Sequence, residues 1–175
     1  MTEQTDKDSE DREFRWMGLD VGEERIGVAV SDALKITAQP YRVVPRKDTA
    51  RAIREILEIA REKKVERIIV GIPLGLRGDK GVMARRITEF AGQLARETDI
   101  PTEEWDERYS TRLAERVLLE GNESRRKRRQ ERDKTAAALI LQNYIDSKSG
   151  GIITTESQEI WMREQRDEKS DRRRS

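Results

Sequence analysis

Hydrophobic residues along this chain occur in short runs in its first part and at helical spacing later. Residues 16–21, 25–31 and 41–44 are largely apolar runs typical of strands, and the third lies between Pro40 and Pro45. Gly22-Glu23-Glu24 has the length of a hairpin loop and offers Gly for unusual backbone angles. Because the connections are short, the three strands are predicted to form an antiparallel meander.

The pattern then changes to alternating helices and strands. Asp48 is a suitable N-cap for a helix whose apolar side chains recur at helical spacing up to Ala60. Further elements are predicted in the order strand 67–71, helix 83–94, strand 101–105, helix 111–119 and a last helix from a basic cluster to about Ser147. Parallel strands joined by right-handed crossovers follow from this order. We therefore predict an α/β fold with a five-stranded mixed sheet, three strands antiparallel and two parallel, flanked by helices.

The 175 residues fit one folded domain between two polar tails. Residues 1–13 carry a net charge of −4 without any apolar period, so we expect a disordered acidic tail. The domain is expected to span residues 14–148. Residues 149–175 are expected to be a charged, flexible tail with at most a short helix at 158–165.

Composition excludes several kinds of chemistry. The chain has no Cys and no His, which excludes disulfides, thiolate or imidazole metal ligands and any Ser-His-Asp triad. A metal would have to be held through oxygen, and such sites suit hard cations such as Mg²⁺ or Mn²⁺. No apolar stretch reaches the roughly 18 residues of a membrane helix, so we expect no membrane association and a cytoplasmic protein.

Three acidic residues stand where a carboxylate is hard to explain structurally. Asp20 ends an apolar strand, Glu107 follows the fifth strand, and Asp133 precedes the most apolar part of the last helix. A carboxylate beside a core destabilises the fold by several kcal/mol unless a charge or metal compensates it. If the three converge, they could hold cations that promote phosphodiester hydrolysis.

Each acid also has a structural interpretation. Asp20 could bond its own turn, and Asp133 could be a first-turn acid that interacts with the helix dipole. Glu107 could pair with Arg108, and the adjacent Asp106 is a competing candidate for the same position.

Basic residues gather just before the last helix. Residues 121–134 carry a net charge of +4, which is expected of a polyanion binder but also of a solvated, ion-paired helix face. Guanidinium groups fit phosphate well, so the candidate phosphate contacts are Arg108, Arg125, Arg126 and Arg129. Ser110 and Thr111 are further hydroxyl donors, although helix capping is their usual role.

Four motifs in sequence order resemble the YqgF/RuvX family. They are Gly18-Leu19-Asp20-Val21-Gly22 with Arg25-Ile26-Gly27-Val28-Ala29, Val70-Gly71-Ile72-Pro73, Asp106-Glu107-Arg108-Tyr109-Ser110-Thr111, and Asp133-Lys134-Thr135-Ala136-Ala137. The resemblance covers about residues 15–147. Two stretches depart from the family pattern: Glu23-Glu24 replaces Thr-Lys-like residues, and Glu131-Arg132 is less apolar than usual.

The resemblance implies an RNase H-like fold and a Holliday-junction-resolvase-like nuclease that processes the 5′ end of pre-16S ribosomal RNA. It maps Asp20, Glu107 and Asp133 onto the family's acidic site, with Mg²⁺ or Mn²⁺ as the metal. The implied partners are structured RNA or branched DNA, and ribosomal particles.

Two other functions stay open. A strand ending in Asp-Val-Gly and followed by a hairpin also resembles the phosphate loop of actin-like and sugar-kinase ATPases. Those proteins need two such domains to enclose a nucleotide, and this chain has room for one. The other alternative is a nucleic-acid-binding or ribosome-assembly factor whose acids do not catalyse.

Overall fold

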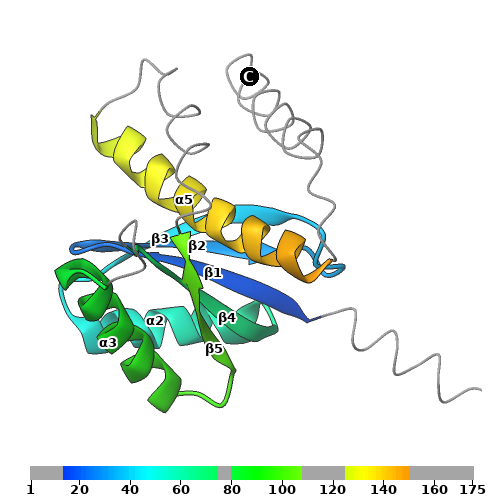
Figure 1. Ribbon diagram of the computed structural model, residues 1–175, viewed down its shortest axis with the longest axis horizontal. Coiled ribbons are helices and arrows are strands. Elements are labelled where there is room, and N and C mark those ends of the chain that lie inside the picture. The colour runs from blue at the N-terminus through cyan, green and yellow to red at the C-terminus, as the bar shows by residue number, and fades with distance from the viewer. Residues whose placement is uncertain (1–13, 75–79, 108–124, 150–175) are drawn as a thin grey trace, which may run out of the picture. The chain divides into compact units, whose positions relative to one another are not determined.

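The computed structural model describes residues 14–74, 80–107 and 125–149 (Figure 1). The chain divides into two units, Met1–Ile145 and Asp146–Ser175, and the first contains the whole sheet. Across these three described ranges, no helix combines the length and the apolar character needed to cross a membrane.

The first three strands form the predicted antiparallel meander. They are β1 (Arg15–Val21), β2 (Arg25–Ser31) and β3 (Ala38–Pro45). β3 is longer than the predicted run 41–44, and it includes two prolines that the sequence pattern placed outside the strand. Proline has no N–H to donate, and it is accommodated here because β3 is at the edge of the sheet.

Two parallel strands continue the sheet on the other side of β1. β4 (Val65–Ile72) pairs with β1, and β5 (Thr102–Asp106) pairs with β4. The strand order is β3-β2-β1-β4-β5. This arrangement confirms the predicted α/β fold class, a five-stranded mixed sheet with three antiparallel and two parallel strands and flanking helices.

Helices α2 (Thr49–Glu62) and α3 (Val82–Arg96) cover one face of the sheet (Figure 1). Asp48 caps α2 as predicted, because its carboxylate accepts a hydrogen bond from a backbone N–H of the first turn. The apolar side chains of both helices pack against Leu19, Val21 and other buried strand residues. Each fully buried large aliphatic side chain contributes about 1.5–3 kcal/mol to folding.

Helix α5 (Arg125–Lys148) lies along the opposite face (Figure 1). Its predicted inner face is buried, namely Ala137, Ile140, Leu141 and Tyr144. A Cβ atom added to Gly18 of β1 would lie 2.7 Å from Leu141 Cβ and 2.8 Å from the carbonyl oxygen of Ala137. The missing side chain on β1 therefore lets α5 lie unusually close to the sheet.

Tyr144 anchors α5 to the sheet through both its ring and its hydroxyl. The ring packs edge-on against Trp16 and Trp105, with centroid separations of 5.4 and 5.3 Å. The hydroxyl donates a 2.7 Å hydrogen bond to Glu103, which also forms an ion pair with Arg67. This half-buried network fixes where α5 lies along the strands.

Several predicted features lie outside the described residues. They are the acidic tail 1–13, the helix 111–119 and the short helix 158–165 within the tail 149–175, of which only residue 149 is described. The domain limits 14–148 therefore stay a prediction.

Candidate active site

Asp20 lies on the α5 side of the sheet. Its neighbours Leu19 and Val21 are buried in the core formed with α2 and α3, and side chains alternate along a strand. Burial, with a smaller contribution from the Asp133 carboxylate, raises the pKa of Asp20 from 3.8 to about 6. Within the described residues its carboxylate accepts no hydrogen bond, which argues against a role in holding its own turn.

Asp133 reaches the same side of the sheet from α5. Because α5 begins at Arg125, Asp133 lies about two turns inside the helix. The interpretation of Asp133 as a first-turn acid is therefore wrong, since the dipole effect is confined to the first turn. Its Oδ2 atom forms an ion pair with Arg25 Nε at 3.2 Å, and about a quarter of each side chain is exposed.

Glu107 approaches Asp20 from the other side, directly after the end of β5. Burial raises the pKa of Glu107 from 4.5 to about 7, with further contributions from Asp20 and Asp106. A Cβ atom on Gly71 of β4 would collide with the Glu107 carboxylate, so that carboxylate lies against the sheet. These observations favour Glu107 over the adjacent Asp106 as the second acid, although the choice between them stays a prediction.

Glycines on neighbouring strands make room for this group of acids. Asp20 stands opposite Gly27 in the β1–β2 register, and a Cβ atom on Gly27 would overlap the backbone carbonyl of Asp133. Gly71 provides the equivalent space under Glu107. The bare strand positions bring residues from β1, α5 and the end of β5 to one region of the sheet.

The three acids interact through Asp20, which raises the pKa of Glu107 and has its own pKa raised by Asp133. Such mutual repulsion is relieved when a cation binds, and all-oxygen donors suit a hard divalent ion. In the described part of the chain, no three acidic side chains are already grouped around one point where an ion could sit. Their role as common metal ligands therefore stays a prediction.

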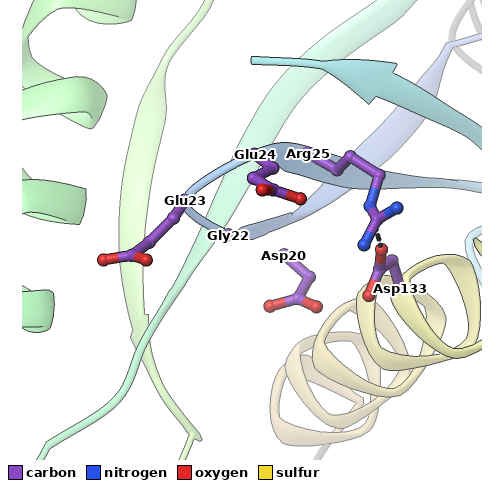
Figure 2. A pocket seen from close by; sticks show the side chains of 6 residues that line it. All are labelled: Asp20, Gly22, Glu23, Glu24, Arg25 and Asp133. Carbon is purple, nitrogen blue, oxygen red and sulfur yellow. Dashed lines mark ion pairs between the residues drawn. The ribbon is translucent and has the colours of Figure 1, made fainter. Parts of the chain in front are cut away.

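An open pocket lies between the β1–β2 hairpin and α5. Its lining consists of Asp20, Gly22, Glu23, Glu24, Arg25 and Asp133. Figure 2 shows Asp20 and Asp133 on the same side of the hairpin, with Arg25 reaching down to Asp133, while Glu23 points away from them.

The hairpin that borders this pocket is held by two arginines from elsewhere in the chain. Arg46 donates from its side chain to Gly22 O and from its backbone to Glu24 O, both at 2.8 Å. The Arg46 guanidinium also packs over the Phe90 ring at 5.0 Å, and burial lowers its pKa. Arg86 of α3 pairs with Glu23 at 3.1 Å. These contacts hold the β1–β2 hairpin to the end of β3 and to α3.

The predicted phosphate-binding arginines are not tested by the structure. Arg108 lies outside the described residues, and the side chains of Arg125, Arg126 and Arg129 lie outside them too, although their backbone belongs to α5. The sequence interpretation missed Arg25. Strand alternation could have found it, because Arg25 is two residues before Gly27 and so shares the α5 side of β2.

Comparisons with known proteins agree with the sequence resemblance. The sequence model of the RuvX family, described as "Holliday junction resolvase", matches residues 14–147. A protein of Natranaerobius thermophilus named "Putative pre-16S rRNA nuclease" is 46% identical over 133 residues, covering 76% of this chain and 94% of the relative. A protein of Clostridioides difficile with the same name is 44% identical over 134 residues, covering 77% and 95%.

Among solved structures, Thermus thermophilus RuvC in complex with a Holliday junction substrate is similar to this chain. The match has a TM-score of 0.49 and 15% sequence identity, and it covers 79% of this chain and 97% of RuvC.

Proposed function

The chain belongs to the RuvX family, and from this premise we propose that it is a metal-dependent nuclease that processes the 5′ end of precursor 16S ribosomal RNA. The family match covers most of the described domain, and curated relatives above 40% identity are named for this substrate. The activity would take place in the cytoplasm, on structured RNA within assembling ribosomal particles.

One observation carries the catalytic part of the proposal. Asp20 in β1 and Glu107 just after β5 have pKa values raised to about 6 and about 7 by burial and by neighbouring carboxylates, Asp133 among them. Buried carboxylates with raised pKa values destabilise a fold, and in proteins they occur mainly at functional sites. A nuclease without His or Cys needs this kind of acid cluster.

Asp20, Glu107 and Asp133 are the residues that would hold Mg²⁺ or Mn²⁺. Bound divalent cations activate water and stabilise negative charge on the leaving oxygen of a phosphodiester. The chain itself positions the carboxylates through the close approach of α5 to the glycines of β2 and β4. Without a cation, burial and the neighbouring carboxylates raise the pKa of Glu107 to about 7, so binding of the cation would release a proton from this carboxyl near neutral pH.

The test is cleavage of an RNA that contains the 5′ precursor and the start of 16S ribosomal RNA, with Mg²⁺ or Mn²⁺. We expect wild-type chain to cleave it, and the variants Asp20→Asn, Glu107→Gln and Asp133→Asn each to lose at least about a hundredfold in rate. Asp48→Asn is the matched control, because Asn caps a helix as well as Asp does.

Three outcomes would contradict the proposal. Cleavage that persists unchanged in Asp20→Asn would come from a contaminating nuclease. Salt-sensitive RNA binding without cleavage, unaffected by the amide substitutions, would instead indicate a non-catalytic assembly factor. Cleavage of a four-way DNA junction but not of RNA would indicate the resolvase activity for which the family is named.

A further inference from the structure

Arg25 is the basic residue among the six that line the pocket, and four of the other five are acids. The other lining residues are Asp20, Glu23, Glu24, Asp133 and Gly22. Arg25 comes from the first position of β2, directly after the hairpin turn, and its guanidinium points across the pocket to Asp133 on α5 (Figure 2). The Arg25 guanidinium therefore contacts Asp133, one of the proposed metal ligands.

The contact between the two side chains is loose for an ion pair in a partly buried site. Arg25 Nε lies 3.2 Å from Asp133 Oδ2, whereas charge-assisted hydrogen bonds of this type are usually about 2.7–2.9 Å long. About a quarter of each side chain is exposed to solvent, which screens the attraction. Such a contact can open without a large loss of stability.

A guanidinium and a divalent cation compete for the same carboxylate oxygen. Either cation would also reduce the repulsion between the Asp20 and Asp133 carboxylates, which contributes to the raised pKa of Asp20. Without a bound metal, the Arg25 guanidinium partly neutralises the site. A divalent cation carries twice the charge and prefers carboxylate oxygen, so it would displace the guanidinium from Asp133.

We propose that Arg25 is an exchangeable internal cation of the acidic site. It holds Asp133 in the metal-free chain, is displaced when a divalent cation binds, and is then available to a phosphate group of the substrate. Its donor fork fits phosphodiester oxygens as well as it fits carboxylates. This inference rests on the proposed metal-dependent function and adds a competitor for the metal.

A purely structural role for Arg25 predicts the opposite result. If Arg25 only ties α5 to the hairpin, Arg25→Gln would loosen the site and weaken metal binding. If Arg25 competes with the metal, the same variant binds metal more tightly. The direction of the change in affinity therefore separates the two roles.

The experiment is calorimetric titration of the full chain with Mn²⁺ at fixed pH and salt. We expect Arg25→Gln to bind Mn²⁺ about three- to tenfold more tightly than wild type, since about 1.4 kcal/mol corresponds to tenfold. Arg86→Gln is the matched control, because it also removes one positive charge from an ion pair with a pocket residue, Glu23, without touching Asp133. We expect its affinity to stay within about twofold of wild type, because that pair is more exposed.

A second readout tests the release of Arg25 toward phosphate. With Ca²⁺ in place of Mn²⁺, to saturate the metal ligands, Arg25→Gln should bind the precursor RNA several-fold more weakly than Arg86→Gln. Should Arg25→Gln fail to fold, the wild-type chain still gives an answer by NMR. The Arg25 Nε–H resonance should shift on addition of Mg²⁺, while the Arg86 resonance should stay in place.

The outcomes separate this inference from the proposed function. If wild type binds Mn²⁺ but Arg25→Gln binds it no more tightly, or if Arg86→Gln gains as much, the exchange is refuted and the nuclease proposal stands. An Arg25 resonance that does not respond to saturating Mg²⁺ refutes the exchange as well. If wild type takes up no divalent cation, the proposed metal-dependent function fails and the exchange fails with it.

Discussion

Replacing Asp20 by Asn should stabilise the fold while it abolishes activity. Burial and the nearby Asp133 carboxylate raise the pKa of Asp20 from 3.8 to about 6. Since each pKa unit corresponds to about 1.4 kcal/mol, ionised Asp20 destabilises the native chain by about 3 kcal/mol. An amide of nearly the same shape carries no charge, so the variant loses this penalty.

The stabilisation should depend on pH in one direction. Well below pH 3.8, at about pH 3, the carboxyl is protonated in both the folded and the unfolded chain, and the penalty is absent. As the pH rises from 3.8 to about 6, the unfolded chain releases its proton first, so the free energy of unfolding of wild type falls. Above about pH 6 the free energy of unfolding of wild type stays lower by the full electrostatic penalty of Asp20. Glu107 adds a similar fall between 4.5 and about 7, which should be smaller in the variant because the Asp20 carboxylate contributes to the raised pKa of Glu107.

The assay is urea unfolding followed by circular dichroism, without divalent cations, at about pH 8 and about pH 3. At the higher pH we expect Asp20→Asn to be more stable than wild type by about 3 kcal/mol, and at the lower pH to differ by less than about 0.5 kcal/mol. The control Asp48→Asn should change little at either pH. A variant that is equally or less stable than wild type at pH 8 would refute the electrostatic account of the site.

Three further measurements test the packing and the charge of the same region. Gly27→Ala should destabilise the chain by about 1–3 kcal/mol in urea unfolding, because the new methyl overlaps the backbone of α5. The control is Gly92→Ala, whose methyl meets nothing closer than 3.7 Å. Equal stability of the two variants would contradict this prediction. Tyr144→Phe should lower the free energy of unfolding by about 1–2 kcal/mol through the loss of its 2.7 Å hydrogen bond. Tyr41→Phe, which loses only an exposed 3.3 Å hydrogen bond, should lower it by less than about 0.5 kcal/mol, and an equal effect of the two would argue against the network. Wild type should release about one proton per chain on binding Mn²⁺ at about pH 6.5, because the pKa values of Asp20 and Glu107 are raised to about 6 and about 7. The release is measured as a dependence of the calorimetric heat on the buffer. Identical heats in all buffers would disprove the raised pKa values.

Much of the fold could be predicted because its signals are local. The apolar runs of β1 and β2 and the helical spacing after Asp48 reflect burial within single elements, and the structure confirms them. The limits of β3 were missed because Pro40 and Pro45 normally end a strand, and only the position of β3 at the sheet edge permits them.

The site was predicted less completely, because it depends on contacts between distant segments. Asp20 and Asp133 were identifiable because each interrupts or precedes an apolar run. The position of Asp133 within its helix was not, because residues 125–132 are almost entirely polar and show no apolar stripe to mark the start of α5. Arg25 went unnoticed because 41% of the residues are charged, and only its contact with α5 distinguishes it from the others.

Gly18, Gly27 and Gly71 lie on three adjacent strands and leave the sheet surface without side chains beneath α5 and the end of β5. At Gly18 and Gly27 the gap between the two layers is fixed by main-chain carbonyls of α5, which cannot adapt by changing rotamer. An alanine at either position would push α5 away from the sheet, whereas at Gly71 it would displace the side chains of Glu107 and Ile140. Side chains can repack around many substitutions elsewhere on the sheet, but at Gly18 and Gly27 only glycine fits without a shift of the α5 backbone.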